Sequence, residues 1–388
     1  MSVNTMNYEQ SSTLLNALYS QVTGKTSLAP VDTSDFVSVA TTTLAAGYDP
    51  VLGAITQMAD KTIFSNRPYT RKMTGLEVDS RRWGAITRKL QIADNDWQNN
   101  AEYTLVDGVS YDMYKVNKPK VLQTNYYGMH TFRRVYTVFR NQLNNAFRGP
   151  DEFGEFMSMV AQNNADVIEQ TRESQNRLTL INLMTGKYAM NQDIIHLLTE
   201  YNTATGLTLT KQTVQQPANY PAFVQWLYAR VSNISDMMTN RSEKFQAKFT
   251  GYDINHHTPL RDQRAFFNSQ YLTEMSSRAI ADIYHESILK LNVTEGLSYW
   301  QSIDSPFDIE NTPVYVDSTG ATVTGTAQTM QDVFGVIIDR DAAGITLYDE
   351  YASTTPYNSE GGYWNLYFDY TLKWLNDFSE KSVILMLD

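Results

Sequence analysis

The residues best placed to do chemistry in this chain form a basic cluster around one tryptophan. Positions 66–148 contain 14 Lys and Arg residues against 7 Asp and Glu residues, whereas the rest of the chain contains 17 against 35. Basic side chains around an aromatic ring can hold a single nucleic-acid strand, or they can bind the acidic face of a neighbouring copy. Because the whole chain has a net charge of −11, we favour the neighbouring copy. The predicted inter-subunit contact residues are Arg71, Lys72, Arg81, Arg82, Trp83, Arg88 and Lys89.

A second group contains the residue types of a metal site with two histidines and one carboxylate. Asp253, His256 and His257 lie within five positions, and His285 follows in a predicted helix. Adjacent histidines in a loop rarely face the same point, and the chain has only five histidines. We therefore predict no metal site.

Two carboxylates, Glu169 and Glu173, lie four residues apart on one face of a predicted helix. A pair of carboxylates can hydrolyse sugars by acid–base catalysis, but no reactive side chain lies beside these two, so surface charge is the better interpretation. The chain also lacks the G-x-S-x-G, G-x-G-x-x-G, Walker and H-E-x-x-H motifs. We predict no catalytic residue, no cofactor and no enzymatic activity.

Composition limits the protein class further. The 388 residues are 42% hydrophobic and include no cysteine, which excludes disulfides and thiol catalysis and fits assembly in a reducing cytoplasm. No apolar run reaches the roughly 18 residues of a membrane span, and the N-terminus lacks the pattern of a signal peptide. We expect a globular protein with no membrane partner.

Several elements can be predicted around these residues. Residues 1–48 show little helical pattern and are interpreted as a disordered tail or an extended arm that becomes ordered on a neighbour. A short helix is expected from Val51 to Met58, a strand from Val121 to Arg140, and a helix of some 35 residues from 151 to 185 after Gly149 and Pro150. Two further helices are predicted, one beginning at Pro221 and one from Leu272 to Leu291.

The closing segment from Asp332 is rich in strand pattern. An apolar run ends at Asp339-Arg340-Asp341, and a second short run covers Ile345 to Tyr348, which predicts two strands joined by a tight turn. The following strand alternates, and its apolar face is expected to contain Trp364, Leu366, Phe368, Tyr370, Leu372 and Trp374. We expect these closing strands to build the sheet of a C-terminal α/β domain, preceded by an extended stretch from Thr312 to Val316.

This ending resembles a known family. The motif from Val336-Ile337-Ile338-Asp339 through Trp364 and Leu366, with the preceding LNVTEGLSYW and TPVYVDS segments, is similar to the end of the major capsid protein of small podophages, the phi-29-like branch. The order of elements also resembles that family over most of the chain. The resemblance implies an α+β chain with the Hong Kong 97-like capsid fold: an N-terminal arm, a projecting β-hairpin loop, a long spine helix with a peripheral sheet, and an axial α/β domain.

The resemblance also implies domain boundaries and partners. We expect an arm at 1–48, a short helical segment at 49–65, a projecting loop at 66–120, a peripheral domain with the spine helix at 121–189, and an axial domain at 190–388. The expected function is that of a major head protein of a tailed bacteriophage, self-assembling into an icosahedral or prolate shell around the genome. The expected partners are further copies in pentamers and hexamers, a separate scaffolding protein, a portal protein, and packaged double-stranded DNA by non-specific proximity.

The expected location is the virion, after assembly in the host cytoplasm. Two other classes stay open on the residues alone. One is an intracellular α/β hydrolase-type enzyme, and the other is a virion nucleic-acid-binding protein that uses the basic segment 66–148.

Overall fold

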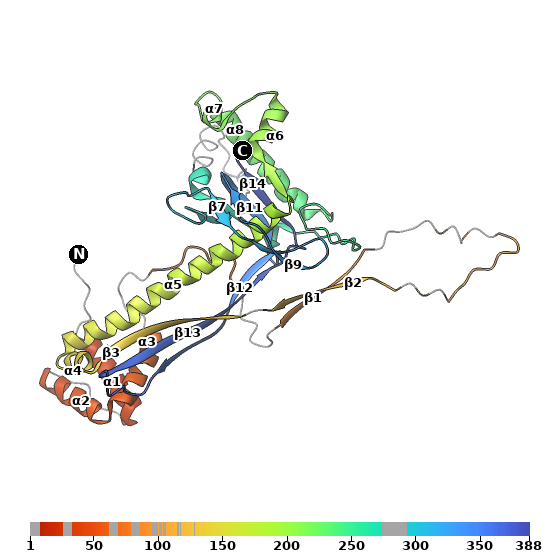
Figure 1. Ribbon diagram of the computed structural model, residues 1–388. Coiled ribbons are helices and arrows are strands. Elements are labelled where there is room, and N and C mark those ends of the chain that lie inside the picture. Colours follow the sequence, from red (N-terminus) through yellow and green to blue (C-terminus); the bar gives the residue numbers. More distant parts are fainter. Residues whose placement is uncertain are drawn as a thin grey trace.

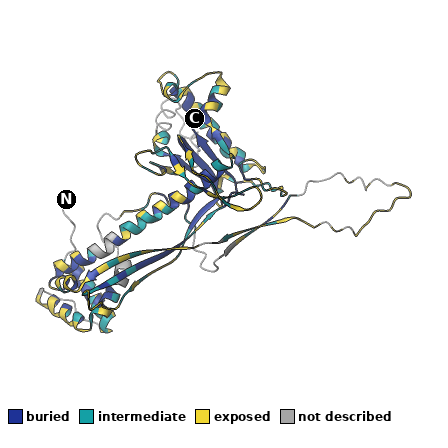
Figure 2. Ribbon diagram, viewed as in Figure 1, coloured by how far each residue is buried: buried dark blue, intermediate teal, exposed yellow. Residues whose placement is uncertain are grey.

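The computed structural model describes residues 8–25, 33–61, 69–78, 86–94, 100, 103, 106–114, 116, 118–127, 129–273 and 293–388. It has two packed regions joined by one long helix, and a two-stranded ribbon that projects sideways from the junction (Figure 1). Buried residues gather in the two packed regions, while the ribbon is largely exposed (Figure 2).

The joining element is helix α5, Pro150–Ala189, whose 40 residues extend about 60 Å. It begins where the sequence predicted: Gly149 is the N-cap, proline occupies the first turn, and Asp151 and Glu152 add favourable negative charge there. The prediction of a long helix is confirmed, and the helix continues four residues beyond the predicted end at 185.

A three-stranded antiparallel sheet lies along α5. It consists of β12 (Ala343–Thr354), β13 (Tyr363–Asn376) and β3 (His130–Phe139), in the order β12-β13-β3. The apolar face predicted for β13 is buried from Trp364, 1% exposed, to Leu372, 2% exposed, whereas Trp374 is 43% exposed. The alternation itself ends earlier, because Asp369 on the opposite face is also buried, where it pairs with Arg133. The expectation that the closing strands build a C-terminal sheet is wrong for β12 and β13, because β13 pairs with β3 and both lie beside α5. It is right for the closing strands at Val333–Asp339 and Ser382–Met386, whose sheet contains only strands that follow residue 190.

The N-terminal residues form helices, which corrects the expected extended arm. Helices α1 (Tyr8–Thr23), α2 (Thr33–Ala45) and α3 (Tyr48–Lys61) pack at the end of the sheet. Several of their apolar side chains, among them Leu15 and Phe36, are fully buried with Trp364 and Phe153. The Thr- and Ser-rich sequence gives a weak helical pattern, so tertiary burial rather than propensity stabilises these helices. The predicted helix at 51–58 lies within α3.

The second packed region surrounds a five-stranded sheet in the order β4-β14-β11-β5-β6. Its strands are β4 (Ile194–His196), β5 (Gln263–Asn268), β6 (Val293–Leu297), β11 (Val333–Asp339) and β14 (Ser382–Met386). Every residue of β11 and β14 is buried, since one face packs on the end of α5 and the other on helices α6 (Leu197–Thr205) and α8 (Tyr220–Thr239). The predicted helix from Pro221 is therefore confirmed as α8.

Short elements complete this region. They are α7 (Lys211–Val214), η2 (Leu260–Asp262), and two small strand pairs, β7 (Ile309–Asn311) with β10 (Gln328–Met330) and β8 (Val314–Val316) with β9 (Thr322–Thr324). Helix α4 (Arg140–Ala146) lies at the other end of the molecule, where Leu143 and Ala146 are buried beside Trp364 and Phe153. Most of the predicted helix at 272–291 lies outside the described residues. No helix in the described part of the chain is both long and apolar enough to span a membrane.

One close approach ties α5 to the turn between β13 and β14. A Cβ atom at Gly186 would lie 2.6 Å from Cε1 of Phe378, so only glycine lets the helix approach this ring. Phe378 is itself 3% exposed in the core beside β11. The turn at 377–380 is therefore fixed to the long helix.

Candidate functional site

The ribbon is the part of the molecule that the predicted contact residues point to. Strands β1 (Ile86–Ile92) and β2 (Val121–Tyr127) pair antiparallel from Ile86 opposite Tyr127 to Ile92 opposite Val121. One face carries exposed apolar side chains, with Leu90 66% and Ile92 64% exposed, and Arg88 precedes them on this face. The single strand predicted over 121–140 is instead two strands, β2 and β3, which belong to different sheets.

The opposite face of β1 is polar and holds the root of the ribbon against the body. The ammonium group of Lys89 bonds to the carboxylates of Asp377 and Glu380, and it donates to Oγ of Ser379 at 3.1 Å. The two carboxylates are almost fully buried in the turn between β13 and β14, with side-chain exposures of 5% and 10%. Lys89 therefore anchors β1 to a turn that lies almost 290 positions later in the chain.

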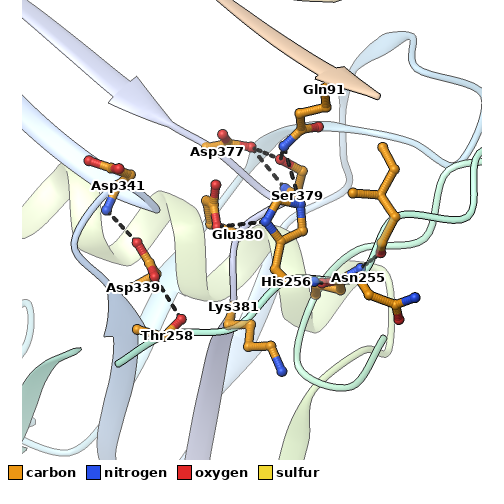
Figure 3. Close-up of polar contacts among 12 residues, drawn as sticks. Gln91, Asn255, His256, Thr258, Asp339, Asp341, Asp377, Ser379, Glu380 and Lys381 are labelled. Atoms are coloured by element: carbon orange, nitrogen blue, oxygen red, sulfur yellow. Dashed lines mark hydrogen bonds and ion pairs between the residues drawn. The ribbon is translucent and has the colours of Figure 1, made fainter. Parts of the chain in front are cut away.

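Gln91 and His256 extend this anchor (Figure 3). The amide nitrogen of Gln91 donates to Oγ of Ser379 at 3.2 Å and lies 3.2 Å from Nε2 of His256. Nδ1 of His256 lies 3.3 Å from Oε2 of Glu380. Burial alone would raise the pKa of Glu380, but the hydrogen bond with His256 and the charge of Lys89 outweigh it and lower the pKa to about 2. Glu380 therefore stays ionised at neutral pH.

The chain approaches the ribbon through residues 69–78, which we call the strap. Arg71 in the strap forms ion pairs with Glu77, also in the strap, at 2.5 Å, and with Glu169 of α5 at 2.6 Å. Glu173, also on α5, accepts from the Tyr69 hydroxyl at 2.5 Å and from the backbone N–H of Lys72 at 3.0 Å. Charge-assisted bonds of this kind are the stronger class of hydrogen bond.

The second half of the strap is held in place by hydrogen bonds from its backbone groups. One carboxylate oxygen of Glu295 accepts from the backbone N–H groups of Thr74, at 2.8 Å, and Gly75, at 2.7 Å. The strap then joins the edge of β12, where the N–H of Ile345 donates to Leu76 and the N–H of Val78 donates to Ile345. These contacts fix the position at which the chain leaves the body for the ribbon.

The predicted contact residues differ in whether their side chains form ion pairs within the chain or are exposed. Arg71 and Lys89 already form ion pairs within the chain, whereas Lys72 and Arg88 have exposed side chains. The other three predicted residues, Arg81, Arg82 and Trp83, lie outside the described residues. Sequence reasoning missed Gln91, Glu295, Asp377 and Glu380, because their partners are distant in the chain and no local spacing marks them.

Three of the residues considered for catalysis or metal binding, Glu169, Glu173 and His256, have structural partners. Glu169 and Glu173 hold the strap, and burial, which would raise the pKa of Glu173, is outweighed by its hydrogen bonds with Tyr69 and Arg177, so that the pKa falls. His256 belongs to the ribbon anchor, and His285 is not among the described residues. Within the described ranges, no three His, Cys, Asp or Glu side chains are grouped to hold a metal ion.

Comparison with known proteins agrees with this architecture. A family model described as "Phi29-like phage major capsid protein" matches residues 15–384. No curated protein sequence matches the chain. Among solved structures, a chain from "Capsid structure of Staphylococcus phage Andhra" is similar at 12% identity and a TM-score of 0.53, covering 84% of this chain and 87% of that one.

A second solved structure has the same fold. It comes from "Structure of head fiber and inner core protein gp22 of native bacteriophage P68", with 11% identity, a TM-score of 0.54, and coverage of 84% of this chain and 87% of that chain. At such low identity these two likenesses establish the fold alone, which is the expected Hong Kong 97-type fold.

Proposed function

The chain belongs to the Phi29-like phage major capsid protein family, and we propose that its copies join by placing the β1–β2 ribbon of one subunit on the body of the next. As a major capsid protein of a tailed bacteriophage, it assembles into a shell of many identical subunits and is part of the virion. The family is structural, and neither the hydrolase nor the nucleic-acid-binding alternative is supported by the match.

The observation that carries the proposal is the apolar outer face of the ribbon. Leu90 and Ile92 are about two-thirds exposed, and Val121, directly opposite Ile92 on β2, is 47% exposed. Contiguous exposed apolar residues on a soluble protein mark an interaction surface. In a closed shell, each such contact is repeated by symmetry, so individually modest interfaces together stabilise the particle.

Basic residues would orient this contact. Arg88 lies on the outer face of β1, and Arg81, Arg82 and Trp83 precede it in the sequence. The chain outside 66–148 is strongly acidic, so a neighbouring copy offers a complementary surface. Such long-range attraction mainly selects orientation and speeds encounter, while burial of Leu90 and Ile92 would supply affinity.

The further partners belong to the same proposal. We infer assembly into pentamers and hexamers in the host cytoplasm with a separate scaffolding protein, and a portal protein at one vertex. Packaged double-stranded DNA would lie against the shell by non-specific proximity, since the net charge of −11 disfavours tight binding.

Electron microscopy of the purified chain, alone and with the scaffolding protein, tests the proposal. Wild-type protein should form uniform shells or capsomer rings, and the triple variant Arg81→Glu, Arg82→Glu, Arg88→Glu should remain a folded monomer. A control with the same charge change, Lys25→Glu, Lys244→Glu, Arg261→Glu, alters exposed residues outside the ribbon and should assemble normally. Normal particles from the ribbon variant would exclude this basic segment as a contact.

A further inference from the structure

Two hollows lie side by side where the strap meets β12, and they differ in charge. The larger has a volume of about 730 Å³ and is lined by Glu77, Asp349 and Glu350. The smaller, of about 240 Å³ at the ribbon root, is lined by Arg88, Arg340 and Lys373. Val78 and Tyr348 line both hollows and separate them. We call them the acidic cleft and the basic cleft.

The basic cleft has more cations than its own carboxylates can neutralise. Its other charged residues are Lys89 and Asp377, which pair with each other, and Asp341. Arg88 and Arg340 are exposed and form no ion pair with any described residue. Trp374, 43% exposed, adds a flat apolar wall on which an aliphatic side chain could pack.

Positive charge continues behind this cleft. Arg264 on β5 has a buried Nη1 atom with no hydrogen-bond partner among the described residues. Burial lowers its pKa, and the charge of Arg340 lowers it further. The carboxylates of Asp339, Asp341 and Glu295 act on Arg264 in the opposite sense, but the two guanidinium groups repel each other, which favours an additional anion at the corner between β11 and β12.

The acidic cleft presents the opposite charge. Glu77 forms an ion pair with Arg71. Arg172 is the cation that lines this cleft, and it lies 3.6 Å from Glu169. Asp349 and Glu350 are exposed on β12, directly after a register shift between Leu347 and Asp349. Such a bulge turns the strand and re-aims the side chains that follow it. The exposed charge of this cleft is therefore dominated by two adjacent carboxylates.

We propose that the basic cleft of one subunit receives Asp349 and Glu350 of a second copy. This inference rests on the proposed shell function, and it names charged residues outside the ribbon face that join neighbouring subunits. A surface that carries a basic and an acidic hollow side by side is complementary to another copy of itself. A nucleic-acid strand laid across the basic cleft would instead meet the carboxylates of the adjacent acidic cleft, so a second copy is the better fit.

Disulfide trapping tests the contact directly, because the chain contains no cysteine. Lys373→Cys and Asp349→Cys proteins are prepared separately, mixed under assembly conditions and oxidised. A disulfide-linked dimer should accumulate in the mixture and exceed that from either protein alone. Lys25→Cys mixed with Asp349→Cys is the matched control, since Lys25 lies on exposed chain after α1 and should give only background.

Charge exchange provides a second measurement. Arg340→Glu with Lys373→Glu should lower particle yield about tenfold or more, because carboxylates would then face carboxylates. Asp349→Lys with Glu350→Lys should do the same, and mixing the two variant proteins should restore co-assembly. Lys25→Glu with Lys244→Glu matches the first charge change and should leave the yield unchanged. Circular dichroism on each variant checks that it is folded.

The outcomes separate this inference from the proposed function. Normal shells without a Lys373–Asp349 disulfide, or without sensitivity to the charge changes, would overturn the cleft contact alone. Disulfide dimers without shells or rings would support the contact and count against shell assembly, whereas absence of both would overturn both. Tight binding of double-stranded DNA at physiological salt that is lost in the Arg340→Glu, Lys373→Glu variant, with normal assembly, would assign the cleft to nucleic acid.

Discussion

The sheet β12-β13-β3 and the ribbon β1–β2 have the same alternating pattern with opposite orientation. In β13 the apolar side chains, from Trp364 to Leu372, face the core of their own subunit. In β1 the polar side chains Lys89 and Gln91 face the body, while Leu90 and Ile92 face outward. In an alternating strand, a polar face that contacts the body of its own subunit leaves the apolar face exposed. Such an exposed apolar face indicates a surface that binds another molecule.

The largest effect should come from opening the core of the sheet. Trp364→Ala removes a side chain that is 1% exposed and whose Nε1 donates to Asp49 at 2.5 Å, so the free energy of unfolding should fall by about 3–5 kcal/mol. Chemical denaturation followed by circular dichroism measures this loss. Trp374→Ala, on the exposed end of the same strand, is the control; an equal loss there would contradict the assignment of the buried face.

A smaller effect is expected from the ribbon anchor. Lys89→Met leaves the buried carboxylates of Asp377 and Glu380 without their cation, which should cost about 2 kcal/mol and speed amide exchange in β1. Hydrogen exchange followed by mass spectrometry reports both strands of the ribbon. Lys89→Arg should retain most of the protection, and Lys72→Met, an exposed lysine of the strap, should change little. Unchanged exchange in Lys89→Met would mean that the ribbon is held by other contacts.

The smallest expected effect is the loss of folding stability at acidic pH when Glu380 becomes protonated. The pKa of Glu380 is depressed from an ordinary value near 4.5 to about 2, so its ionised form stabilises the folded state above pH 4.5. That contribution is lost as pH falls from about 4.5 to about 2. Glu380→Gln should therefore reduce stability at pH 5 by about 1 kcal/mol, and the difference from wild type should vanish near pH 2. Denaturation curves of both proteins between pH 2 and pH 6 measure it; a constant difference would show that the carboxylate charge is not the cause.

The local sequence pattern was sufficient to predict elements whose periodicity and end signals lie within a short stretch of the chain. The long helix after Gly149, the alternation of β13 and helix α8 could all be predicted from periodicity and end signals. The assignment of β13 to a C-terminal sheet failed because pairing with β3, more than 220 positions earlier, leaves no local mark. The N-terminal helices were missed because their burial depends on β13 and α5 rather than on helix propensity.

The candidate site was predicted only in part for the same reason. The basic composition of 66–148 identified the segment, and Arg88 lies on the exposed face of the ribbon. Composition could not show that Arg71 and Lys89 are neutralised by Glu169 and Glu380, because an ion pair depends on distances that only the folded chain defines. The division into domains at 48, 65, 120 and 189 stays a prediction.

The contact between Gly186 and Phe378 has a genetic consequence. Phe378 shares its short turn with Asp377, Ser379 and Glu380, which hold Lys89. Any larger residue at 186 must displace the ring, whose Cε1 atom would be 2.6 Å from the new Cβ, and the turn would move with it. A mutation at the buried end of α5 would then tilt a ribbon that the mutated residue does not contact. Mutants with soluble subunits but misassembled heads could therefore map to a core glycine, and second-site revertants to Phe378.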